Sequence, residues 1–109
     1  MKIYLGRLDL KQLLSSGPIY YINYMPLLTS FYGIILTMNF TDHNPPHFHA
    51  RFAEFKALFD FDGEMFEGAM PDNKKVLIKA WAILHKDELN ANWILASSNE
   101  SIIKIEPLR

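Results

Sequence analysis

The sequence predicts an α+β fold: a four-stranded antiparallel β-meander with one main helix packed on its apolar face, a short N-terminal extension and a short C-terminal strand. Two observations support this prediction. Apolar and polar residues alternate along much of residues 30–68, as in strands with one buried face. After Pro71, apolar residues instead recur at helical spacing. The 109 residues are enough for one domain, and half of them are hydrophobic.

The phase of the alternation defines the strands. Residues 30–41 are predicted as a single strand whose apolar side is Ile34, Leu36, Met38 and Phe40. In HFHARFAEFKALFDF the apolar residues change from even to odd positions, which one regular strand cannot accommodate. A tight hairpin centred on Ala53-Glu54 resolves this change. The pairs that it predicts are Phe52 with Phe55, Ala50 with Ala57 and Phe48 with Phe59.

The remaining elements follow from turn and helix signals. Asp62-Gly63 is a strong turn signal before EMFEG, the fourth strand, where Phe66 is expected opposite Phe59. Pro71 and Asp72 mark the start of a helix that runs to about Asn90 and covers the phenylalanine side of the sheet. Its expected apolar stripe is Leu77, Ala80, Trp81, Leu84 and Leu89. The segment SIIKIEPL is predicted as the final short strand.

Composition limits the class of protein. We expect residues 1–24 to form the extension and residues 25–109 a single α+β domain, because the pattern becomes regular only after Met25. A net charge of −1 gives no support for bulk attraction to nucleic acid, although a local patch could still bind RNA. The absence of cysteine excludes disulfides and thiolate metal sites. The apolar runs are far shorter than the ~20 residues of a membrane helix, so we expect a cytoplasmic protein of bacterial type without a membrane partner.

The segment from Asp42 to Arg51, DHNPPHFHAR, holds three of the four histidines. Two prolines stiffen the loop before it becomes a strand. If Phe48 faces the core, His47, His49 and Arg51 share the opposite face of the sheet, with side chains ~7 Å apart along the strand. The same register sets Asp60 across from His47.

Three interpretations of this surface are open. In the first, His47 and His49 bind a divalent metal such as zinc, with His43, Asp42 or Asp60 as a third ligand and one position left for water or substrate.

In the second, His47 and His49 act without metal as an acid–base pair on a phosphodiester while Arg51 holds the phosphate. In the third, His43 and His47 satisfy backbone groups of the proline corner, and His49 and Arg51 line a solvated face or a partner interface.

Three stretches, FYGIILTMNFTDHNPPHFHARF, EFKALFDFDGEMFEG and WAILHKDELNANW, resemble the prokaryotic family catalogued as domain of unknown function 4160. Members show a DHxPPHxH-type segment after a strand, a hairpin pair and a helix with the pattern W-x3-H-x2-E-L-x3-W. The matching residues are Asp42, Pro45, Pro46, His47 and His49, then Trp81, His85, Glu88, Leu89 and Trp93. The similarity covers about Pro26 to Leu108. Members typically begin with a Met-Pro like Met25-Pro26, so residues 1–24 depart from the family pattern.

The resemblance implies a small bacterial protein of a kind often found beside a second small domain, of unknown function 2442, in an arrangement similar to toxin–antitoxin pairs. Two functions are therefore considered. The first is an interaction component of a toxin–antitoxin-like two-protein module, which docks a small cognate partner of that second type or forms a homo-oligomer. The alternative is a metal-dependent or His/Arg-based hydrolase, nuclease-like, with His47, His49 and Arg51 as catalytic residues.

Overall fold

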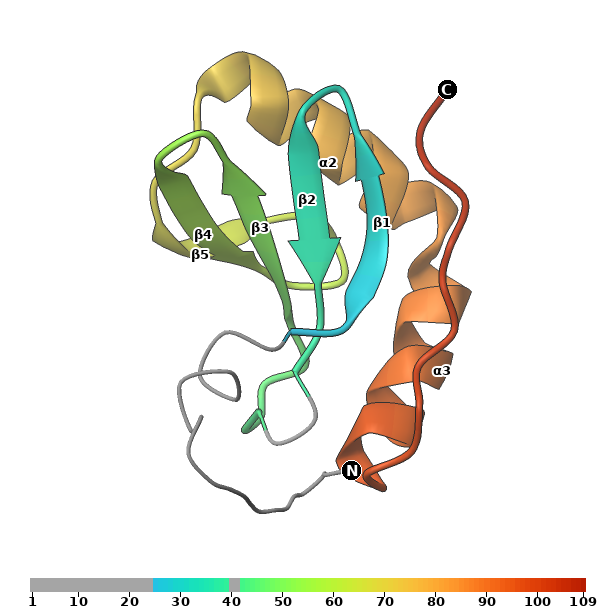
Figure 1. The fold of residues 1–109 in the computed structure, drawn as a ribbon. Coiled ribbons are helices and arrows are strands. Elements are labelled where there is room, and N and C mark those ends of the chain that lie inside the picture. Colours follow the sequence, from blue (N-terminus) through green and yellow to red (C-terminus); the bar gives the residue numbers. More distant parts are fainter. Residues whose placement is uncertain (1–24, 40–41) are drawn as a thin grey trace, which may run out of the picture.

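The computed structural model of the chain describes residues 25–39 and 42–109, which form one sheet and two helices (Figure 1). The sheet is antiparallel with the strand order β1-β2-β3-β4-β5, and these strands are Leu27–Phe31, Ile34–Thr37, Phe48–Phe52, Phe55–Phe59 and Met65–Gly68. The helices are α2 (Asp72–Leu84) and α3 (Lys86–Ser97). The α+β class and the antiparallel meander are confirmed, but the described residues form five strands rather than four and two helices rather than one. The predicted extension, residues 1–24, lies outside the described residues.

The segment predicted as one strand over residues 30–41 belongs to a hairpin. The chain reverses at Tyr32 and Gly33, which have φ angles of 49° and 80° and separate β1 from β2. Two-residue turns with positive φ match the twist of the flanking strands, so two residues are enough to connect β1 with β2. The predicted apolar side is confirmed for Ile34, Leu36 and Met38, all at 0% exposure; Phe40 lies outside the described residues.

The hairpin at Ala53-Glu54 is confirmed, with Ala53 at a φ of 52°. The register contains all three predicted pairs: Phe48 with Phe59, Ala50 with Ala57 and Phe52 with Phe55. The next hairpin differs from its prediction, because an irregularity after Leu58 makes Met65 the partner of Phe59. Phe66 is therefore not opposite Phe59 and is half exposed.

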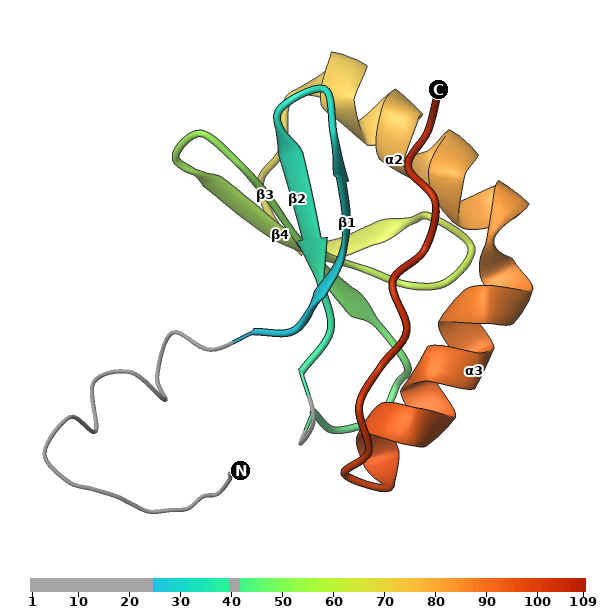
Figure 2. The same ribbon diagram turned by 45° about the vertical axis from the view of Figure 1, so that its right-hand side comes forward.

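Both helices lie on the phenylalanine side of the sheet, the side on which the single helix was predicted. The second helix, α3, extends beyond the end of the sheet (Figure 2). The Phe48 ring lies 5.7 Å from Phe59 and 5.6 Å from Trp81 of α2. The predicted single helix instead ends at Leu84 and restarts at Lys86, with His85 at φ −122° between them. The predicted stripe is therefore wrong at Ala80 and Leu84, which are exposed; the buried residues of α2 are Ile78, Trp81 and Ala82.

The C-terminal segment after α3 forms no strand, contrary to the prediction. It is nevertheless attached to the helices and to the β1 edge (Figures 1 and 2). The Ile105 amide donates to the Leu28 carbonyl at 2.8 Å, and the Trp81 Nε1–H donates to the Glu106 carbonyl at 2.8 Å. The side chain of Asn92 both donates to the Ile103 carbonyl and accepts from the Ile103 amide, each at 2.8 Å. One backbone hydrogen bond to β1 and the side-chain contacts of Trp81 and Asn92 thus hold the segment in place of a regular strand pairing.

No helix in the described part of the chain is both long and apolar enough to cross a bilayer.

Candidate metal site

The connection from β2 to β3 brings three potential ligands to one end of the sheet. Asp42 follows β2, His47 immediately precedes β3, and His49 is the second residue of β3. Because side chains of alternate strand residues point to the same side, Phe48 enters the core while the two histidines lie on the other side of the strand, where His47 is still buried. This confirms the expectation that His47 and His49 share a face, and their rings lie 5.4 Å apart.

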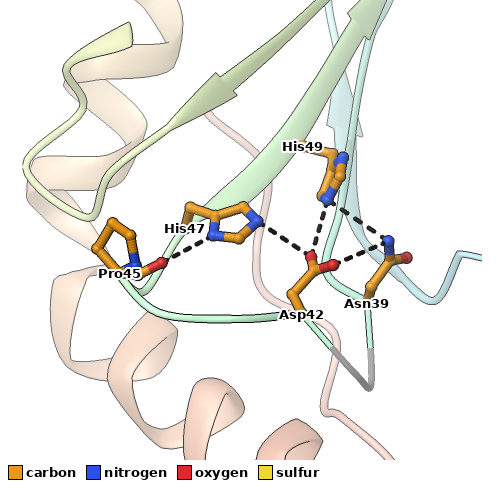
Figure 3. Close-up of polar contacts among 5 residues, drawn as sticks. All are labelled: Asn39, Asp42, Pro45, His47 and His49. Carbon is orange, nitrogen blue, oxygen red and sulfur yellow. Dashed lines mark hydrogen bonds and ion pairs between the residues drawn. The ribbon is translucent and has the colours of Figure 1, made fainter. Parts of the chain in front are cut away.

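One carboxylate oxygen joins the two histidines (Figure 3). Oδ2 of Asp42 lies 2.8 Å from Nε2 of His49 and 3.1 Å from Nε2 of His47. The three side chains are largely withdrawn from solvent, with exposures of 10% for His47, 19% for Asp42 and 26% for His49. Of the metal-ligating groups in the described residues, only these three form a cluster, with one ligand atom from each within 4.8 Å of the other two.

The protonation of His47 can be inferred from its backbone contact. Its Nδ1 lies 2.8 Å from the carbonyl oxygen of Pro45. A carbonyl oxygen can only accept, so Nδ1 carries the hydrogen. In the neutral ring, Nε2 then carries a lone pair directed at Oδ2 of Asp42, which is also electron-rich. That contact is favourable only if a proton or a cation lies between the two atoms.

The surroundings of the cluster restrict water and orient the ligands. The His47 ring lies 5.5 Å from Trp93 of α3 and 5.9 Å from Phe66 of β5. Nδ2 of Asn39 lies 3.4 Å from Oδ1 of Asp42 and 3.5 Å from Nε2 of His49. A histidine whose second nitrogen donates to a backbone carbonyl, beside a carboxylate that accepts from an amide, is the usual outer shell of a metal ligand set.

The ligand types and separations fit a small divalent ion. With ligand bonds of about 2.1 Å, adjacent ligand atoms of a tetrahedral or octahedral site lie roughly 3.0–3.4 Å apart. The separations of 2.8 and 3.1 Å from Oδ2 are close to this range. Imidazole and carboxylate ligands suit zinc as well as iron or manganese, and three protein ligands leave coordination positions open.

The other predicted site residues are not part of this cluster. His43 is exposed in the loop, and Arg51 is exposed on β3. Asp60 caps its own turn, because its Oδ1 accepts the amides of Asp62 and Glu64, both at 2.9 Å. Of the three candidates for the third ligand, the structure brings Asp42 alone to both histidines.

Two residues beside His47 were not recognised as site residues from the sequence. Trp93 entered the sequence analysis only as part of the helical motif of the family, and Phe66 only as a partner of Phe59. The sequence did contain a signal for Trp93. This residue follows the buried Leu89 by four positions, so both lie on the side of α3 that faces the protein. No pattern pointed to Phe66, whose position depends on the irregular pairing of β4 with β5.

Fold and site define a small α+β domain with a two-histidine, one-carboxylate cluster at the end of its sheet. The chain belongs to the family described as Domain of unknown function (DUF4160), whose model matches residues 33–94, more than half of the chain. The matched range includes the whole cluster and Trp93. No curated protein and no solved structure matches the chain.

Proposed function

We propose that the protein is a hydrolase that binds one divalent metal ion, such as zinc, through Asp42, His47 and His49. A single observation supports this most strongly: the Pro45 carbonyl holds the hydrogen on Nδ1 of His47, and Nε2 then faces the same carboxylate oxygen as His49. A cation beside these atoms would supply the positive charge that the contact between His47 and Asp42 requires, and it could accept a lone pair from Nε2 of each histidine.

The arrangement suits hydrolysis more than structural metal binding. Structural zinc sites use four protein ligands, whereas catalytic ones use three and keep a position for water or substrate. A metal in such a site lowers the pKa of water and polarises the bond to be cleaved. In the overall reaction the water hydroxyl joins the electrophilic atom, and the remaining proton goes to the leaving group. Trp93 and Phe66 would limit access of bulk water on the His47 side.

Metal titration of the full chain without a histidine tag tests the metal site. We expect one zinc per chain by calorimetry and by elemental analysis after dialysis. His47→Gln and His49→Gln should weaken zinc binding by more than the roughly 10–100-fold that loss of an outer-shell partner costs. His43→Gln is the matched control, because His43 lies in the same loop but outside the cluster. Equal zinc affinity of all four proteins would refute the assignment.

Turnover tests the enzymatic part of the proposal. Hydrolysis of a chromogenic ester should appear with zinc, disappear with EDTA and disappear in His49→Gln. Activity that survives EDTA yet is lost in the same variant would instead support acid–base chemistry by the two histidines, with Arg51 binding an anion.

A second candidate function, an interaction component of a toxin–antitoxin-like module in a bacterial cytoplasm, is favoured by the outer side of α2. Val76, Ile83 and Leu84 are 60–68% exposed there, although each is large and apolar. Co-expression with a neighbouring protein of the second small family (domain of unknown function 2442) tests this. A complex that Ile83→Lys weakens and His47→Gln leaves intact would support it. A chain that stays monomeric with and without that partner would contradict both the pairing and a homo-oligomer.

A further inference from the structure

A pair of positive side chains lies next to the metal cluster on the same face of the sheet. Arg51 of β3 and Lys56 of β4 are direct partners in the antiparallel register. Directly opposed residues of such a pair project from the same face with Cβ atoms about 4.5–5.5 Å apart. Both residues are exposed. Like charges placed this way destabilise a sheet, so the pair needs a reason other than stability.

Within the described residues, no ion pair neutralises either charge. Other lysines do form ion pairs. Lys79 with Glu64 and Lys86 with Asp62 join the β4–β5 turn to the helices, and Lys75 pairs with Asp72 within α2. The remaining cross-strand neighbour of Arg51 is Ile35.

An acidic residue does occur on this face, but in a different row. Glu67 pairs with Leu58, which in turn pairs with His49. Glu67 is therefore level with the cluster and not with Arg51 and Lys56.

The distance to the metal cluster suits one small anion. Arg51 follows His49 by two residues, so their Cα atoms lie about 7 Å apart along the same face. The long side chain of arginine can cover that distance, and its planar fork matches the oxygens of a phosphate. With a divalent ion on Asp42 and two neutral histidines, the local charge including Arg51, Lys56 and Glu67 is about +2, which favours a doubly negative group over a single carboxylate.

We propose that Arg51 and Lys56 bind the phosphoryl group of the substrate, so that the hydrolase acts on phosphate esters. This inference rests on the proposed metal-dependent function, because it places the ester between the metal cluster and the cationic pair. Water would add to phosphorus, the phosphorus–oxygen bond to the alcohol would break, and the alcohol oxygen would take up a proton. Arg51 and Lys56 would hold the non-bridging oxygens throughout.

Phosphate binding tests the anion site separately from the metal. Inorganic phosphate is titrated into zinc-loaded and zinc-free protein at low ionic strength, with acetate as the comparison anion. Arg51→Gln and Lys56→Gln should each raise the Kd for phosphate roughly tenfold or more, as expected for loss of a charge-assisted contact. Lys104→Gln is the matched control, since Lys104 is an exposed lysine outside this face. The melting temperature of the first two variants should not fall, because the repulsion is relieved.

Turnover then distinguishes the kind of ester. Zinc-loaded protein is assayed with p-nitrophenyl phosphate, bis(p-nitrophenyl) phosphate and the neutral ester p-nitrophenyl acetate. We expect the glutamine variants to lose activity on the phosphate esters and to keep any activity on the acetate. A phosphomonoester carries about two negative charges and a diester only one, so the charge of the site predicts preference for the monoester, and preference for the diester would contradict that argument.

The outcomes separate the two proposals. Phosphate affinity that is unchanged in both glutamine variants would overturn the anion site, even if zinc binds to the cluster as proposed. Failure to bind zinc would overturn the metal-dependent function, and phosphate titration of the zinc-free protein would still decide whether Arg51 and Lys56 form an anion site.

Discussion

Replacing Asp42 by asparagine should remove most of the stabilisation that zinc confers. The stability of the zinc-free protein should change little. Asparagine has the shape of aspartate but lacks the charge of a metal ligand. For the unchanged protein, zinc at 100 times its Kd adds about 2.7 kcal/mol to the free energy of unfolding. In a domain of this size each kcal/mol corresponds to roughly 4–8 °C, so the melting temperature should rise by roughly 10–20 °C.

The same arithmetic gives the response of the variant. If Asp42→Asn weakens zinc binding about 100-fold, the same zinc concentration equals its Kd and adds only about 0.4 kcal/mol, or roughly 2–3 °C. Without zinc the change should be small. The new amide can donate to the Nε2 lone pair of His47, which lies 3.1 Å from Oδ2 in the unchanged protein.

Thermal melts monitored by circular dichroism, with zinc and with EDTA, measure both effects, and His43→Ala serves as the control that keeps the full response. Equal zinc-induced shifts in Asp42→Asn and in the unchanged protein would refute the assignment of Asp42 as a ligand. A large loss of stability in EDTA alone would show instead that the carboxylate acts by binding protonated histidines.

Three further outcomes test the framework around the site. Gly63→Ala should cost about 1–3 kcal/mol in urea unfolding, since Gly63 has a φ of +85° and an added Cβ would lie 2.7 Å from the Cα of Lys79; a neutral result would contradict this close packing. Asn92→Ala should cost about 1–3 kcal/mol and speed amide exchange at Ile103, because it removes two hydrogen bonds from a buried side chain; unchanged exchange would contradict the attachment of the C-terminal segment. The hydrogen bond and charge of Glu64 raise the pKa of Lys79, so this contact stabilises the fold below the unfolded lysine pKa of ~10.4 and is lost as pH rises through the higher folded value. The stability difference between the unchanged protein and Lys79→Met should therefore shrink at strongly alkaline pH, and a constant difference would argue against the contact.

Much of the sheet could be predicted because the positions of the apolar residues, even or odd, show which side of each strand faces the core. The change of phase between Phe52 and Phe55 required a two-residue turn, and the turn is there. The turn at Tyr32-Gly33 was missed because the alternation from Ile34 onward is regular by itself and does not reveal where the strand begins. The break at His85 has no glycine or proline signal, so the sequence pattern did not reveal it.

The site was predictable in part for a similar reason. Strand geometry alone places His47 and His49 on one face, and the ring separation of 5.4 Å agrees with it. The third ligand depends on the path of the loop, which sequence spacing does not determine, so Asp42, His43 and Asp60 were equivalent candidates. The turn motif around Asp60 was a usable signal against that residue, because aspartate before a tight turn often accepts the backbone amides that follow it.

The strand order has a consequence for how the chain folds. Each strand pairs with its neighbour in sequence, so the sheet can form by successive closure of short loops, which favours fast folding. Two of these connections are two residues long, whereas the connection between β2 and β3, residues 38–47, is ten residues long. Closing ten residues instead of two costs roughly 1–2 kcal/mol more chain entropy. The Asp42–His49 contact fastens the middle of this longest connection to β3, so whatever occupies that contact, proton or metal, also restricts the loop that must close before β2 and β3 can pair.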